Sequence, residues 1–170
     1  MTDQLQIISP SLTGEDKVAR ENELISNTKP TPFSLKAKML AQGRTDTVLA
    51  ATENLTVRLK VYASGGENEI HAHPYEDHSF IILQGSAKFF GPENEQIELS
   101  QYQGIMLPKG NLYKFFATSD EPLVMIRVGN PAHKNMKFPT RINQKGVEMK
   151  GDSKENKKEE VIYKNQYFGE

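Results

Sequence analysis

Short runs of alternating hydrophobic and polar residues, separated by turn-forming residues, occupy the middle of the chain. They are FSLKAKML, TVLAA, LTVRLKVYA, EIHAH, HSFIILQ, SAKFF, QIELS, GIMLP, LYKFF and LVMIRVG. Gly, Pro, Asn and Asp lie between them, and no long helical pattern interrupts the series. Closely spaced β-rich runs of this kind are typical of an all-β sandwich or barrel. The pattern therefore predicts an all-β domain, a β-barrel, over residues 33–130.

The two ends of the chain are more polar. Residues 1–32 form an N-terminal arm in which EDKVARENELI predicts a short helix with Thr13 as its cap. Residues 131–170 form a C-terminal extension with the charge-dense segment QKGVEMKGDSKENKKEE, which we interpret as a solvated, partly flexible tail. The closing VIYKNQYFGE is aromatic again, and we expect it to dock on the barrel or on a partner subunit.

Composition narrows the range of partners. The 170 residues include 21 basic and 22 acidic side chains. This balance gives no electrostatic reason to expect nucleic acid or an anionic membrane as a partner. The sequence shows no apolar leader and no run of membrane-spanning length, so we expect a cytoplasmic protein.

Three of the four histidines lie within the stretch GGENEIHAHPYEDHSF. Side chains at i and i+2 of a strand share a face, so HAH places His71 and His73 side by side. Pro74 blocks further strand pairing, and PYED is typical of a turn. On the returning strand, His78 shares a face with Phe80. Such a hairpin would bring the three imidazoles together inside a barrel.

Neutral imidazoles suit zinc, copper, iron and nickel, and the chain has no cysteine that could offer a thiolate instead. The other interpretation is that these histidines are surface or turn residues with no shared role. Their spacing alone does not decide between the two. His133 lies far along the chain beside Pro131, and we leave it outside the site.

The same residues carry a resemblance to a known family. Gly65, five residues, HAH, four residues, His78, six residues and Gly85 resemble the first motif of the cupin superfamily. Pro108 and Gly110 in PKGNLY resemble the start of its second motif. The resemblance covers about half of the chain. It implies a cupin fold, a double-stranded β-helix or jelly-roll barrel, with a metal inside and commonly a homodimer.

Two departures from the cupin pattern affect the implied site. His78 stands where most cupins have a carboxylate ligand, and Tyr113 stands where the second motif has a histidine. The resemblance thus implies a divalent metal on His71, His73 and His78, with Tyr113 as a fourth ligand or as a proton donor. Fe(II) is favoured, with nickel, zinc, copper or manganese as alternatives. The other interpretation of Tyr113 is an aromatic core residue.

Charged residues near the expected pocket are ambiguous. In LTVRLKVY, Arg58 and Lys60 would hold a carboxylate or phosphate if their face pointed inward. We favour the interpretation in which they form an outward, solvated face. Arg127 in LVMIRVG has the same ambiguity, so these three are candidate substrate-binding residues.

Acidic residues surround the histidine stretch. Glu67, Glu76 and Asp77 are candidates to orient the imidazoles as hydrogen-bond acceptors. Their place in turns favours the simpler interpretation that they are solvated acids.

Cupins of this kind often resemble dioxygenases. The resemblance therefore implies an oxidoreductase acting with Fe(II) on a small acid, enol or dicarbonyl. Alternatives are a lyase with Tyr113 as base, an isomerase, or a non-catalytic module that binds a small ligand. The triple histidine argues against a metal-free sugar epimerase. Apolar patches in both extensions, such as LQIIS and VIYKNQYF, favour a homodimer in which an extension crosses to the partner.

Overall fold

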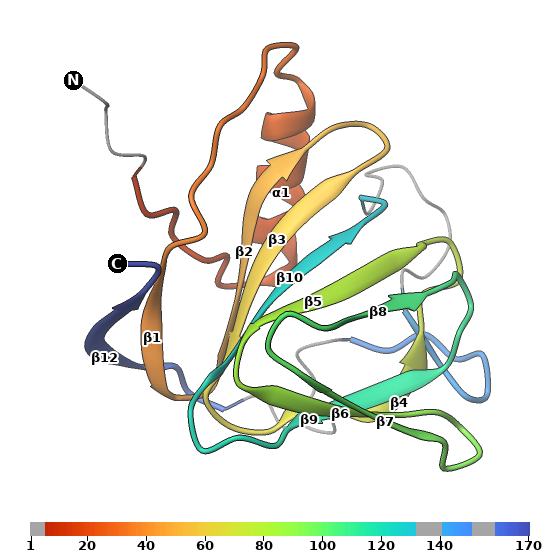
Figure 1. Ribbon diagram of the computed structural model, residues 1–170. Coiled ribbons are helices and arrows are strands. Elements are labelled where there is room, and N and C mark those ends of the chain that lie inside the picture. The colour runs from red at the N-terminus through yellow and green to blue at the C-terminus, as the bar shows by residue number, and fades with distance from the viewer. Residues whose placement is uncertain (1–5, 132–140, 151–158) are drawn as a thin grey trace.

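The computed structural model describes residues 6–131, 141–150 and 159–170. Two antiparallel five-stranded sheets face each other and form a barrel (Figure 1). The first sheet has the order β2 (Arg44–Ala51), β3 (Thr56–Tyr62), β10 (Leu123–Gly129), β5 (His78–Gln84) and β8 (Gly104–Leu107). The second has the order β11 (Ile142–Asn143), β4 (Gly66–Ala72), β9 (Tyr113–Ala117), β6 (Ser86–Phe90) and β7 (Gln96–Ser100). The expectation of an all-β fold is confirmed.

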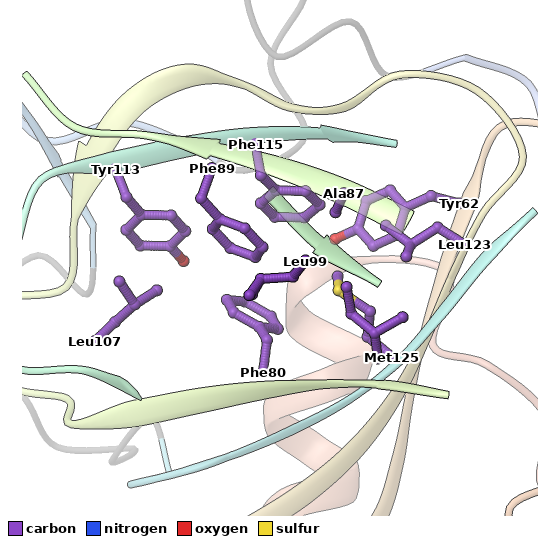
Figure 2. Close-up of a cluster of buried hydrophobic side chains, with 11 residues drawn as sticks. Tyr62, Phe80, Ala87, Phe89, Leu99, Leu107, Tyr113, Phe115, Leu123 and Met125 are labelled. Atoms are coloured by element: carbon purple, nitrogen blue, oxygen red, sulfur yellow. The ribbon is translucent and has the colours of Figure 1, made fainter. Parts of the chain in front are cut away.

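An apolar core fills the space between the sheets. Figure 2 shows Tyr113, Phe89 and Phe115 reaching from the second sheet toward Phe80 and Leu107 of the first. The rings of Phe89 and Phe115 stack with centroids 5.1 Å apart. All five side chains are buried, and burial of large aromatic side chains is a main source of stability in a small domain. The candidate site lies next to this core, because Tyr113 belongs to the core and its hydroxyl reaches His78.

A third layer covers the outer face of the first sheet. Strand β1 (Ala37–Gln42) pairs with β12 (Ile162–Phe168) in a separate two-stranded ribbon, seen beside the barrel in Figure 1. Leu40 of β1 packs in one buried cluster with Leu59 and Val61 of β3. Strand β3 is therefore buried on both of its faces. The closing aromatic segment, expected to dock on the barrel or on a partner, pairs here with β1 of its own chain.

The N-terminal arm forms α1 (Gly14–Ile25), as its sequence predicts. Thr13 caps it: its Oγ1 accepts from the Asp16 N–H at 3.0 Å, and Asp16 Oδ2 accepts from the Thr13 N–H at 2.9 Å. Leu24 packs on Val48 of β2, which points to the interior side of the sheet. The helix thus lies over the open interior face. A helix with the length and apolar character needed to cross a bilayer is absent from the described residues.

Candidate functional site

The turn between β4 and β5 brings three imidazoles together. His71 lies near the end of β4, His73 lies just beyond it, and His78 opens β5 after the turn at Pro74. The ring centroids of His71 and His73 are 5.3 Å apart, and those of His73 and His78 are 5.0 Å apart. The turn brings the histidines side by side as expected, but the hairpin prediction is wrong: β4 pairs with β9 and β11 of the second sheet, β5 pairs with β10 and β8 of the first, and the turn crosses between the sheets. His133 lies outside the described residues.

His78 is held at this point by close backbone packing. It pairs across the sheet with Gly129 of β10, and a Cβ placed at Gly129 would lie only 2.5 Å from the Cβ of His78. Only glycine leaves room for this approach. Gly129 thus allows β10 to lie directly against His78 of β5.

Main-chain carbonyls fix the ring tautomers. His71 Nδ1 lies 2.8 Å from the carbonyl oxygen of Glu69, and His78 Nδ1 lies 3.5 Å from that of Glu76. A carbonyl can only accept, so Nδ1 carries the hydrogen in each ring and Nε2 carries the lone pair. The Nε2 atom of His71 is buried and has no hydrogen-bond partner, although it lies 3.0 Å from Glu67 Oε2. The Nε2 lone pair and the Glu67 carboxylate oxygen thus lie side by side, an arrangement that a shared cation would stabilise.

All three imidazoles are neutral at physiological pH. Burial, reinforced by the positive charge of Arg127, lowers the pKa of His78 to about 2. Burial together with Arg127 and Arg141 holds the pKa of His73 well below its ordinary value. The pKa of His71 is lowered mainly by burial, against the opposing pull of Glu67. Neutral rings are the form that binds metals.

Two buried carboxylates adjoin the histidines. Glu67 is 4% exposed and accepts from Lys60 Nζ at 2.7 Å, from the Tyr62 hydroxyl at 3.1 Å and from Arg141 Nη2 at 2.8 Å. Burial alone would raise the pKa of Glu67, but Lys60 and Arg141 outweigh it and hold the pKa well below its usual range. The expectation of a solvated acid is wrong here, because the strand directs this carboxylate into the barrel.

The other two acids near the histidines differ from each other. Glu76 is 6% exposed, accepts from Arg127 Nη2, and has Oε2 3.5 Å from His73 Nδ1. The solvated-acid interpretation is therefore wrong for Glu76 as well. It holds for Asp77, which is exposed and accepts from the Lys109 N–H at 2.9 Å.

Tyr113 is both a core residue and a partner of the histidines. Its side chain is buried in the apolar core, and its hydroxyl lies 3.1 Å from His78 Nε2. Burial, with the nearby charge of Glu67, raises the pKa of the phenol above its ordinary value. The phenol therefore stays protonated, and its O–H donates a hydrogen bond to the Nε2 lone pair of His78. The two interpretations of Tyr113, core and proton donor, describe the same side chain.

The basic residues of β3 and β10 point inward. Arg58 and Lys60 are 7% and 5% exposed and Arg127 is 2% exposed, and all three line one cavity with His73. The interpretation of Arg58 and Lys60 as a solvated face is wrong. The β1–β12 ribbon buries the apolar residues of β3 on its outer side, so the charged set takes the inner side.

Each strand cation already has an acidic partner. Arg58 donates to both carboxylate oxygens of Asp46, through Nε at 2.9 Å and through Nη2. Lys60 donates to Glu67, and Arg127 donates to Glu76. The inner wall of the barrel is thus a network of paired charges.

Arg141 and side chains of α1 complete the cavity, a role that the sequence did not indicate for them. Arg141 precedes β11, whose Asn143 pairs with His71 of β4, so part of the C-terminal extension packs on the barrel. Helix α1 contributes Lys17, Val18 and Asn22 to the wall. The cavity measures about 970 Å³, at the upper end of the range for small-molecule sites. No local pattern marks these residues, because their place depends on long-range packing.

The three imidazoles are of the chemical type that binds a divalent metal, but metal binding itself stays a prediction. Three neutral imidazoles lie together, and the buried Nε2 of His71 has no hydrogen-bond partner. Among the residues the structure describes, however, no three His, Cys, Asp or Glu side chains are placed to hold an ion. Each imidazole instead faces a partner of its own: Glu67, Glu76 or Tyr113. An ion would have to replace these contacts as the rings turn.

Comparison with known proteins identifies the barrel. The family described as "Cupin domain" matches residues 58–129, which carry the histidines and Tyr113. The chain belongs to the cupin superfamily. A comparison with curated protein sequences finds no significant match for this cupin.

Solved structures share the fold of this cupin. A Klebsiella pneumoniae protein with a double-stranded β-helix domain superposes with a TM-score of 0.52 at 17% identity, over 61% of this chain and 91% of that one. Streptomyces Pac13, described as a nucleoside dehydratase, superposes with a TM-score of 0.50 at 13% identity, over 66% of this chain and 89% of that one. At these identities the likeness shows the fold alone.

We expect the pair of Asp46 and Arg58 to make the free energy of unfolding of this cupin depend on pH. Burial would raise the pKa of Asp46, but the Arg58 guanidinium and the Lys60 ammonium hold it well below its ordinary value of 3.8. At a pH between the lowered pKa of Asp46 in the folded protein and its ordinary pKa in the unfolded chain, the unfolded chain binds a proton that the folded protein does not. We therefore expect the free energy of unfolding to fall as the pH drops below about 4, and to fall less steeply in Asp46→Asn. Urea titrations across this range measure both slopes, and equal slopes would contradict the assignment.

Proposed function

We propose that this cupin is an enzyme in which His71, His73 and His78 hold a divalent metal, Fe(II) being favoured, beside a cavity for a small molecule. The observation that supports it best is the buried Nε2 of His71, which faces Glu67 without a hydrogen bond. A divalent ion on these imidazoles would polarise a carbonyl or enol oxygen of the substrate. Since all three proposed ligands are neutral, the ion's charge would favour an anionic or enolate substrate.

Proton transfer is the reaction type that the geometry supports best. Tyr113 holds a proton on its hydroxyl, which donates to His78 Nε2, and the Glu76 carboxylate adjoins His73. A proton donor beside His78 and a carboxylate beside His73 suit an elimination or an isomerisation. Pac13, which shares the fold, is described as a nucleoside dehydratase. By this analogy of fold, an elimination is also a candidate reaction for the cupin.

A dioxygenase-like reaction is the second candidate. Three neutral imidazoles leave coordination positions open on a divalent ion for a small acid, enol or dicarbonyl together with oxygen. The reason to consider this reaction is that His78 stands where most cupins of this pattern have a carboxylate. The two reactions differ in a measurable way, because only the second consumes oxygen.

Metal analysis and a substrate panel test the proposal. Protein purified without added metal is analysed by elemental mass spectrometry and then incubated with small hydroxy acids, keto acids and diketones. Bound metal with turnover and no oxygen uptake supports a lyase or isomerase, and oxygen uptake supports the dioxygenase. Absence of both metal and turnover would leave a non-catalytic binding cupin. The homodimer and the cytoplasmic location stay predictions.

Tyr113→Phe separates the two roles proposed for the phenol. If Tyr113 supplies a proton, we expect metal content to stay at the wild-type level while kcat falls about a hundredfold, the typical effect of losing a general acid. The phenyl ring keeps the packing of the core, so folding should persist. A parallel loss of metal would instead make the oxygen a ligand. Unchanged metal and unchanged kcat would leave Tyr113 a core residue only.

A further inference from the structure

Two buried guanidinium groups each have one nitrogen without a partner. The Nη1 atoms of Arg127 and Arg141 are inaccessible to solvent and form no hydrogen bond. The Arg127 side chain is only 3% exposed and that of Arg141 is 12% exposed. A buried charged donor without an acceptor is costly, and native proteins seldom leave one. These atoms call for an acceptor that the described protein does not supply.

The two arginines are built alike. Each uses its Nη2 on a buried glutamate, Arg127 on Glu76 and Arg141 on Glu67. The glutamates hold the guanidinium planes in place, so each arginine is fixed before any ligand arrives. Fixed guanidinium groups lose little side-chain entropy when they bind an anion.

Both arginines line the same cavity, beside His73. Six of the side chains that line the cavity are cationic and four are carboxylates. The surplus of positive charge favours an anionic occupant.

The two other cations that the strands place on the wall, Arg58 and Lys60, are already engaged. Arg58 uses Nε and Nη2 on the two oxygens of Asp46, and Lys60 donates to Glu67. Neither has a buried nitrogen without a partner among the described residues. Of the strand residues suggested by the sequence, only Arg127 therefore qualifies, and Arg141 joins it from the C-terminal extension.

We propose that Arg127 and Arg141 bind the oxyanion of the substrate, a carboxylate or a phosphate, next to His73. This deepens the proposed function and rests on the same cavity, but anion binding by the two arginines does not need the metal. The sequence pattern of a single strand does not reveal this pair, because the two residues come from β10 and from the segment before β11.

Calorimetry on the chelator-treated full chain tests the proposal without turnover. The probes are succinate, inorganic phosphate and succinamide, the neutral counterpart of succinate. We expect at least one anion to bind and succinamide not to bind. Tighter succinate binding assigns a carboxylic acid substrate, and tighter phosphate binding assigns a phosphate ester. Binding of neither anion, or equal binding of succinamide, would overturn the proposal.

Variants connect that binding to the two arginines. Arg127→Gln and Arg141→Gln are each expected to weaken the anion about tenfold to a hundredfold, the effect of losing a charge-assisted hydrogen bond. Lys88→Gln removes the same charge from a surface pair with Glu98 and should change binding less than about threefold. Equal weakening in all three would reduce the effect to net charge and contradict the proposal.

A paired substitution keeps the test valid if Arg127→Gln does not fold. Glu76→Gln with Arg127→Gln removes both charges of the buried pair, so neither is left without a partner. We expect this variant to fold, by circular dichroism, and to bind the anion about tenfold or more weakly. Wild-type affinity in the folded double variant would exclude Arg127 from the site. Loss of metal binding with intact anion binding would contradict the proposed function and leave this inference standing.

Discussion

Replacing His73 with alanine is expected to remove most of the bound metal and to lower activity at least about a hundredfold, while the barrel stays folded. Loss of residues that only support a metal ligand already costs about 10- to 100-fold in affinity or activity, and loss of a ligand should cost more. His73 lies on the cavity wall beyond the end of β4 and takes no part in the apolar core. Its removal therefore leaves the packing of Phe80 and Tyr113 intact.

Metal content by elemental analysis and unfolding by urea measure the two halves of this prediction. His71→Ala and His78→Ala should lose metal in the same way. His133→Ala is the matched control, because it removes the one histidine of the chain that the proposal does not assign to the metal. If all four variants kept the metal content of the wild type, the three histidines would share no site, and the cluster would be a structural feature of a binding protein.

Glu67→Gln is expected to cause the largest loss of stability, about 3–5 kcal/mol. The carboxylate is buried and accepts from Lys60, Tyr62 and Arg141. Glutamine has nearly the same shape but no charge, so the change leaves the buried Arg141 guanidinium without this anion and the Lys60 ammonium with only Asp46, 4.0 Å away. Domains of this size have a total stability of about 5–15 kcal/mol, and the variant should be close to unfolding.

Urea titration of the free energy of unfolding measures this effect. Glu98→Gln is the control, since Glu98 also pairs with a lysine but lies at the surface, 3.6 Å from Lys88. An exposed pair contributes about 0–1 kcal/mol, so this variant should resemble the wild type. A loss below 1 kcal/mol in Glu67→Gln would mean that water or another anion replaces the carboxylate.

Local patterns in the sequence were enough to find the strands and the turn that brings the histidines together, although not that this turn joins two sheets. Strands β5, β6, β7 and β10 coincide with the runs HSFIILQ, SAKFF, QIELS and LVMIRVG. Alternation fixes which side chains share a face, and Pro74 marks the turn. Both signals depend only on neighbouring residues, so a single sequence is enough to detect them.

Alternation does not say which face is the interior. Strand β3 carries Val57, Leu59 and Val61 on one side and Arg58 and Lys60 on the other. The usual expectation turns the apolar side inward, but here the β1–β12 ribbon gives that side an outer layer to pack on. Only the long-range pairing of two chain ends makes the charged side the interior.

Buried acids and Arg141 depend on the same kind of information. Glu67 looks like a turn acid until Lys60 and Arg141 are known to face it. Arg141 lies next to a charge-dense segment whose composition is typical of a tail. Its role follows from the pairing of Asn143 with His71, across seventy residues of chain.

The cavity wall comes from three parts of the chain: the segment that matches the cupin domain, helix α1 and the C-terminal extension. The three histidines of the proposed site, Tyr113 and Arg127 all lie in the segment that matches the cupin domain. Lys17, Val18 and Asn22 lie on a helix outside that match, which the barrel needs for little of its own packing. Substitutions on this helix can reshape the cavity without disturbing the residues proposed to do chemistry. The choice of small molecule and the proposed chemistry can thus diverge separately, because substitutions in Gly14–Ile25 alter the wall and leave the strand residues unchanged.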